Sequence, residues 1–149
     1  MKLSAKGDYA LRALMDLASC YNQRLVQTHE MAMNHGIPEK FLEQILRDLK
    51  NARIVTAKSG TNGGYSLSRP PDKITFGEVI RLMDGPLAPI GCVSLMYYNQ
   101  CSEEPICKFQ MVMKRVRDAI ADIIDNTTLA DVTGDNAPVK PHQECMYYI

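Results

Sequence analysis

The chain has 149 residues, 46% of them hydrophobic, which suits one domain with an appendage. It carries 17 lysines and arginines against 17 acids, so its net charge at pH 7 is zero. No apolar stretch reaches the ~18 residues that a membrane span requires, and the first residues lack the apolar core of a signal peptide. We therefore expect a cytoplasmic protein without a membrane partner.

The first part of the chain predicts two helices with a short extended piece between them. Ser4 is expected to cap a helix that ends near Tyr21, because its hydroxyl can accept from free N–H groups one turn inside. Residues 24–26 read as extended. Thr28 is then expected to cap a brief helix that Gly36 stops.

A third helix opens at Pro38, which suits a first-turn position because its missing N–H does no harm there. Its apolar residues recur at helical spacing and predict a buried stripe: Phe41, Leu42, Ile45, Leu46 and Leu49. Two helices joined by a short turn around a glycine make a helix-turn-helix, whose second helix enters the DNA major groove. A plain helical hairpin with a solvated polar face is the alternative.

A β-hairpin is predicted next, with strands at 54–58 and 65–69 around the glycine-rich loop 59–64. A hairpin directly after a recognition-type helix is a wing, and its glycines let the backbone approach phosphates. Residues 38–73 hold seven lysines and arginines against four acids, which fits a nucleic-acid face, although a solvated surface explains it almost as well. The pattern predicts a mainly α protein with a small β-hairpin wing, a winged helix-turn-helix.

The second half begins with a predicted capping box, in which Thr75 caps a helix and Glu78 reaches back to the cap N–H. A helix over about 105–125 carries a narrow apolar stripe that suits packing against a second copy of the chain. Membership of a monomer core is the alternative. The stripe residues are Ile106, Phe109, Met113, Val116, Ile120 and Ile123.

Three cysteines lie just before that helix, with eight residues between Cys92 and Cys101 and five between Cys101 and Cys107. Thiolates are soft ligands, so three from one loop suit an iron–sulfur cluster or zinc. Reduced cysteines of a cytoplasmic protein favour metal binding over disulfides. An ordinary loop with packed thiols is the alternative, and a fourth ligand is missing from the loop. Cys20 reads as a packing residue.

The expected organisation has three parts. Residues 1–74 form a DNA-binding domain, and residues 75–132 contain the cysteine loop and the dimerisation helix, followed by a short helical turn. Residues 133–149 look like an extended tail, in which His142 and Cys145 are isolated. There is no Cys-x-x-Cys pair, Ser/His/Asp set or phosphate-cradling loop, so we expect no enzyme and no small-molecule substrate.

With these residues laid out, the chain resembles the IscR/NsrR/RirA family of bacterial winged-helix regulators over about residues 1–132. The resemblance implies a dimeric transcription factor, here a repressor, whose cysteine loop binds an iron–sulfur cluster and whose long helix crosses its twin. It rests on the three cysteines and on Met1-Lys-Leu-Ser-x-Lys-Gly-x-Tyr-Ala10, Gly36-Ile37 with Phe41-Leu-Glu-Gln-Ile45, Gly60-x-x-Gly-Gly-Tyr65 and Thr75-x-Gly-Glu-Val-Ile80.

By this resemblance Cys92, Cys101 and Cys107 are the cluster ligands, and the cluster is [2Fe–2S] or [4Fe–4S]. One branch of the family uses a histidine three residues after the last cysteine as the fourth ligand, where this chain has Gln110. Another branch uses an aspartate of the partner's first helix, and Asp8 occupies that place. His35, Cys145 and an exogenous small molecule are the other candidates.

The resemblance also implies a homodimer on an imperfectly palindromic double-stranded DNA operator. Glu43 matches a base-reading acid of the family, since carboxylates accept from cytosine amino groups. Relatives often place arginine just before the first wing glycine, where this chain has Ser59 beside Lys58. The expected DNA-binding residues are Lys40, Glu43, Gln44, Arg47, Lys58, Ser59, Gly60, Gly63 and Tyr65. A zinc- or thiol-based sensor of the same fold is the alternative function.

Overall fold

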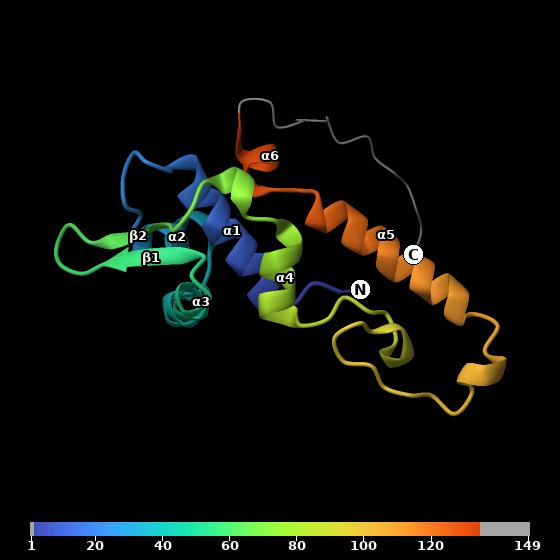
Figure 1. Cartoon of the computed structure of the whole chain (residues 1–149). Coiled ribbons are helices and arrows are strands. Elements are labelled where there is room, and N and C mark those ends of the chain that lie inside the picture. Colours follow the sequence, from blue (N-terminus) through green and yellow to red (C-terminus); the bar gives the residue numbers. More distant parts are fainter. Residues whose placement is uncertain (1, 135–149) are drawn as a thin grey trace, which may run out of the picture.

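The computed structural model describes residues 2–134 and is mainly helical, with one two-stranded antiparallel hairpin (Figure 1). This confirms the predicted fold class. The helices are α1 (Ala5–Ser19), α2 (Thr28–His35), α3 (Glu39–Asn51), α4 (Phe76–Asp84), α5 (Gln110–Asp125) and α6 (Leu129–Thr133), and the strands are β1 (Val55–Lys58) and β2 (Gly64–Leu67). Single 3-10 turns lie at Pro71–Lys73, Gly91–Val93 and Glu104–Ile106.

One hydrophobic core joins the two halves of the chain. Helix α1 runs through the middle and contacts α2, α3, α4, α6 and β2. Each buried leucine or isoleucine contributes about 1.5–3 kcal/mol relative to exposure. The largest buried side chains include Leu14, Leu17, Leu42, Ile45, Leu46, Leu49, Ile74 and Leu129, so segments before and after residue 74 share this core.

The predicted ends of the first helices are partly confirmed. Ser4 caps α1, its hydroxyl accepting from the Gly7 N–H at 3.0 Å, and Gly36 closes α2 in the left-handed region at φ 62°. The cap at Thr28 is wrong: Thr28 is the first residue of α2, and the cap residue Gln27 makes no side-chain bond. Pro38 is likewise the cap residue of α3 rather than a first-turn residue, because its ψ of 122° is not helical.

Phe41 also departs from its prediction. Phe41 lies at the edge of the buried stripe of α3 and is 37% exposed. It packs against Tyr9 of α1, which is itself only half-buried and so does not cover Phe41 completely. The two rings pack edge to face with centroids 5.8 Å apart. Leu42 and the other three stripe residues are buried as predicted.

The wing is tied back to the body of the protein. Strands β1 and β2 pair in the register Val55–Leu67 to Lys58–Gly64, slightly shorter than predicted. Tyr65 also exchanges two backbone hydrogen bonds with Val26, of 2.8 and 3.0 Å, so the extended piece before α2 borders β2. Gly64 is required here, because its φ is 153° and a Cβ would lie 2.7 Å from the Val26 carbonyl oxygen.

Half of the predicted capping box of α4 is confirmed. The Thr75 hydroxyl accepts from the Glu78 N–H at 3.2 Å. The prediction of the reciprocal bond is wrong, because the Glu78 carboxylate accepts hydrogen bonds from the Arg69 guanidinium instead. A complete capping box lies at α6, where Thr128 caps the helix and Asp131 reaches back to the Thr128 N–H at 2.7 Å.

Helix α5 extends away from the body, joined to it near its C-terminal end (Figure 1). It begins at Gln110 rather than near residue 105, because the turn Glu104–Ile106 is followed by the extended Cys107, with ψ 108°. Arg81 of α4 donates two hydrogen bonds to the Asp125 carboxylate, of 2.5 and 2.8 Å, and so fixes that end.

None of the helices within residues 2–134 has the length and apolar character needed to span a membrane. The predictions for His142 and Cys145, and all but the start of the predicted tail, lie outside the described residues. Thr133 still belongs to α6.

Candidate functional site

The predicted recognition helix presents a polar face to solvent. Lys40, Glu43, Gln44 and Arg47 are all exposed on α3, opposite its buried leucines. A chain of contacts orders this face. Gln44 donates to Asp48 at 3.1 Å and accepts from Arg47 at 3.4 Å. Lys6 of α1 contacts Asp48 at 2.8 Å, and this hydrogen bond, with smaller contributions from Gln44 and Arg47, lowers the pKa of the Asp48 carboxyl.

An open groove of about 450 Å³ lies where the wing meets α2 and the end of α3. Its polar lining suits an anion, since two lysines reach it and the first N–H groups of α2 have no side-chain cap. The lining residues are Gln27, Thr28, Lys50, Ala57, Lys58, Ser59, Gly60, Gly63, Gly64 and Tyr65.

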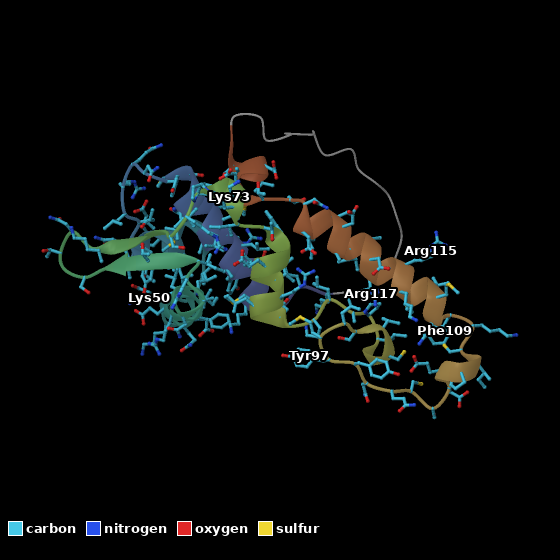
Figure 2. All side chains as sticks on the ribbon, in the orientation of Figure 1. Lys50, Lys73, Tyr97, Phe109, Arg115 and Arg117 are labelled. Atoms are coloured by element: carbon cyan, nitrogen blue, oxygen red, sulfur yellow. The ribbon has the colours of Figure 1, made fainter. Side chains whose placement is uncertain are left out.

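This groove gathers five of the predicted DNA-binding residues: Lys58, Ser59, Gly60, Gly63 and Tyr65. The ring of Tyr65 is half-buried and also packs against the core. Lys50 lies on the predicted polar face of α3 but was not among the named DNA-binding residues, and the start of α2 was missed altogether. Lys50 follows Arg47 by three residues on one helix face, a spacing that could have indicated it. Figure 2 shows Lys50 on α3.

The turn of the wing depends on its glycines. Gly60 has φ 106°, in the region that favours glycine. A Cβ on Gly63 would lie 2.2 Å from the Lys58 carbonyl oxygen. The backbone at Gly63 therefore passes close to the Lys58 carbonyl group at the tip of the wing.

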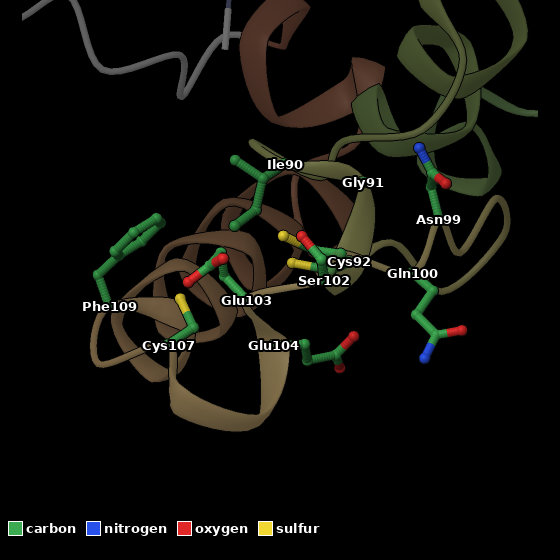
Figure 3. A pocket seen from close by; sticks show the side chains of 11 residues that line it. Ile90, Gly91, Cys92, Asn99, Gln100, Ser102, Glu103, Glu104, Cys107 and Phe109 are labelled. Carbon is green, nitrogen blue, oxygen red and sulfur yellow. The ribbon is translucent and has the colours of Figure 1, made fainter.

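The three cysteines of the loop line one pocket of about 550 Å³ (Figure 3). Cys92 lies in the 3-10 turn Gly91–Val93, and Cys107 follows the turn Glu104–Ile106. Both are half-buried, whereas Cys101 is exposed, and all three are free thiols. The three cysteines thus line one cavity, and their role as ligands stays a prediction.

The donor set of this pocket fits a cluster. Within residues 2–134 no three His, Cys, Asp or Glu side chains lie close enough to hold a single metal ion. A zinc ion needs its ligands within about 2.0–2.3 Å of one point. The ligands of an iron–sulfur cluster bind different iron atoms and stand around a larger body. Three soft thiols line this pocket, and thiolates are the donors that such a cluster takes.

A hydrogen-bonded carboxylate lies in the same pocket. Glu104 lines it and accepts from the Tyr98 hydroxyl at 2.6 Å and from the Gln110 amide at 2.7 Å. These bonds, that of Tyr98 first, lower the pKa of the Glu104 carboxyl, and the bond to Glu104 raises the pKa of Tyr98. Sequence reasoning missed this network, because its three residues belong to no common helix or strand.

Asp8 and His35, two of the predicted candidates for the fourth ligand, do not line this pocket. Asp8 is on α1, where its carboxylate accepts from Arg12 at 2.9 Å, and its contact with a partner's cluster stays a prediction. The His35 Nε2 atom lies 2.9 Å from an Asp16 carboxylate oxygen. Cys20 packs against the core, as predicted.

A second connection between the cysteine loop and α5, besides that of Gln110, is made by an arginine. Arg117 projects from α5 towards the cysteine loop, and its guanidinium donates to the Val93 carbonyl at 2.6 Å (Figure 2). Val93 is buried and directly follows Cys92. This bond links the backbone beside Cys92 to α5.

Three helices followed by a wing define the class of winged helix-turn-helix transcriptional regulators. Residues 3–135 match the Rrf2 family, described as an iron-dependent transcriptional regulator, and the chain belongs to the Rrf2 family.

Relatives and solved structures agree with this assignment. An HTH-type transcriptional regulator of Mycobacterium tuberculosis, Rv1287, is 38% identical over 141 residues, which cover 93% of this chain and 84% of that protein. The structure of CymR, the global cysteine regulator of Bacillus subtilis, is 34% identical with a TM-score of 0.76, covering 89% of this chain and 96% of CymR. The structure of T. potens IscR is 30% identical with a TM-score of 0.72, and the match covers 99% of this chain and 97% of IscR. The protein is thus a transcriptional regulator and not an enzyme.

Proposed function

We propose that this regulator is a homodimeric repressor whose affinity for its operator is set by an iron–sulfur cluster held by Cys92, Cys101 and Cys107. The observation that carries the proposal is the convergence of these three free thiols on one cavity. When bound, the cluster supplies a centre that reacts with oxidants and depends on iron supply. The fourth donor is Asp8 of the partner subunit or another group.

On the DNA side, the exposed face of α3 reads the major groove and the wing holds the backbone. The groove between the wing and α2 would take a phosphate, since Lys50, Lys58 and the free N–H groups of α2 surround it. The carboxylate of Glu43 accepts hydrogen bonds and therefore suits a cytosine amino group.

The dimer contact is supported by the apolar surface of α5. Within the described chain no residue of this helix is fully buried, and its Val116 and Ile123 are 38% and 66% exposed. Phe109, just before the helix, is 59% exposed. A stripe of this kind marks an interface. A two-fold dimer requires an imperfectly palindromic operator, with half-sites about one helical turn or a small multiple apart.

Loss of a phosphate contact gives the first expected result. Arg47→Ala and Lys58→Ala should each weaken binding to operator and unrelated DNA alike, because phosphates carry no sequence information. Each should lower the slope of log K against log salt by about one phosphate per subunit. Fluorescence anisotropy at several salt concentrations measures this, with the exposed Lys73→Ala as control, on the far side of the wing from α3 (Figure 2). Wild-type slopes for both variants would contradict the assignment.

Glu43→Ala should instead change base preference. Removing the acceptor abolishes discrimination at one position per half-site, by about 1–3 kcal/mol, while affinity for random DNA stays unchanged or rises. Selection from a randomised half-site library compares the two proteins. An unchanged preferred sequence would exclude Glu43 as a base-reading residue.

The cluster itself is tested by anaerobic purification, with absorption and Mössbauer spectra before and after exposure to oxygen and to nitric oxide. A visible charge-transfer spectrum with matching iron and sulfide supports the proposal. The second candidate is a zinc- or thiol-based sensor of the same fold, which the likeness to the cysteine regulator CymR favours. Colourless anaerobic protein that retains zinc, or binds no metal, would select it.

A further inference from the structure

The side-chain amide of Gln44, on the exposed face of α3, is held at both of its ends. Its nitrogen donates to the Asp48 carboxylate at 3.1 Å, and its oxygen accepts from the Arg47 guanidinium at 3.4 Å. A carboxylate only accepts hydrogen bonds, and a guanidinium only donates them. Both partners therefore select the same orientation of the amide. Because the bond to Asp48 is the shorter one, the orientation depends mainly on Asp48.

Asp48 is in turn held from α1, which packs against α3. The Lys6 ammonium lies 2.8 Å from the Asp48 Oδ2 atom, whereas the Gln44 amide donates to Oδ1, so the two partners use different oxygens. The hydrogen bond from Lys6 is the largest cause that lowers the pKa of the Asp48 carboxyl. At neutral pH Asp48 is therefore ionised and can only accept from Gln44.

The held amide still has groups to offer to DNA. One N–H and one lone pair of the oxygen remain after the bonds to Asp48 and Arg47. Adenine presents the N7 acceptor and the N6–H donor in the major groove, and a glutamine amide binds both at once. Guanine presents two acceptors there, so the oxygen of a held amide would face another acceptor. An amide in one fixed orientation thus matches adenine and cannot turn to suit guanine.

We propose that Asp48 is a positioning residue for base reading, which fixes the amide of Gln44 for an adenine in each half-site. Lys6 supports it by holding the second carboxylate oxygen. This inference rests on the proposed function, in which α3 enters the major groove. It names the base that Gln44 reads and a residue that acts through Gln44.

The test is selection from a library with randomised half-sites, followed by titration of operators changed at one base pair. Wild type should prefer adenine at one half-site position, and Gln44→Ala should reduce this preference by about tenfold or more. Asp48→Leu should reduce it by about threefold or more, while the preference at the position read by Glu43 stays. Affinity for random DNA should stay or rise, because a negative charge is removed.

Asp72→Leu is the matched control for Asp48→Leu. Asp72 is an exposed acid in the turn Pro71–Lys73, outside α3 and the wing. This variant should keep the wild-type preference at every position. Circular dichroism and thermal unfolding confirm that each variant folds.

Two further measurements separate base reading from a purely structural link between α1 and α3. Lys6→Met removes the ion pair but leaves the Asp48 carboxylate as an acceptor for Gln44, so it should retain most of the adenine preference. In a double-mutant cycle, Asp48→Leu should have no further effect on this preference once Gln44 is replaced by alanine.

Three results would overturn the inference. Wild-type preference in Gln44→Ala would show that Gln44 reads no base, and wild-type preference in Asp48→Leu would show that the amide needs no support. Equal losses in Lys6→Met and Asp48→Leu would assign Asp48 a structural role alone. Each of these results leaves the proposed function standing if Glu43→Ala still changes base preference. If no substitution on the exposed face of α3 changes DNA binding, the proposed function fails, and this inference with it.

Discussion

Replacing Cys92, Cys101 or Cys107 by alanine is expected to reduce bound iron and sulfide to about a tenth of the wild-type content or less, because each change removes a thiolate donor whose loss costs more than that of an outer-shell partner. Each variant should bind the operator like cluster-free wild type and no longer respond to oxygen. Iron and sulfide analysis after anaerobic reconstitution measures the first effect, and operator titration the second.

Cys20→Ala is the matched control for these variants. Cys20 lies at the end of α1 and packs against the core, away from the pocket. It should keep the full cluster content. Wild-type iron content in all three loop variants would mean that the thiols lining the pocket do not hold the cluster.

Val116→Glu is expected to convert the dimer to monomers and to lower operator affinity by at least about 100-fold, because one subunit alone engages one half-site. The physical reason is that a carboxylate in an apolar interface loses its hydration without gaining a partner. Sedimentation velocity at micromolar concentration measures the assembly, and anisotropy measures DNA affinity.

Lys114→Glu provides the control, since it introduces the same side chain on the opposite side of α5. Lys114 is exposed, and two residues of separation place it well away from Val116 around the helix. This variant should remain dimeric. A wild-type protein that sediments as a monomer would exclude the dimer through α5.

Local signals in the sequence were enough for most of the fold. The buried leucines of α3 repeat at helical spacing, and Gly36 stops α2 where the backbone must enter the left-handed region. These features depend on neighbours a few residues apart, so sequence shows them directly. The alternation of strand, glycine-rich turn and strand predicted the wing for the same reason.

Features set by the path of a loop could not be predicted in this way. Glu78 was expected to cap its own helix, but its carboxylate accepts hydrogen bonds from Arg69, nine residues earlier. Helix α5 starts late because Cys107 is extended, a property that its position after Pro105 does not reveal. The network around Glu104 likewise joins a loop residue, a residue of a 3-10 turn and the first residue of α5, which belong to no common helix or strand.

For the candidate site, the closeness of the three cysteines in the sequence was enough to single them out, and their role as ligands stays a prediction. Their surroundings could not be predicted, since the pocket is built from irregular backbone between Ile90 and Phe109. The groove beside the wing shows the same limit. Lys58 was predicted from its place in the hairpin, whereas the start of α2 joins it only through the fold.

In the proposed mechanism the state of the cysteine pocket sets operator affinity. The most direct measurement is an anaerobic operator titration of one protein preparation, carried out with the cluster present, after its removal by a chelator, and after reconstitution, all at the same salt concentration. We expect dissociation constants that differ by at least about tenfold between the two forms and return to the first value on reconstitution. Equal dissociation constants in all three samples would contradict the account.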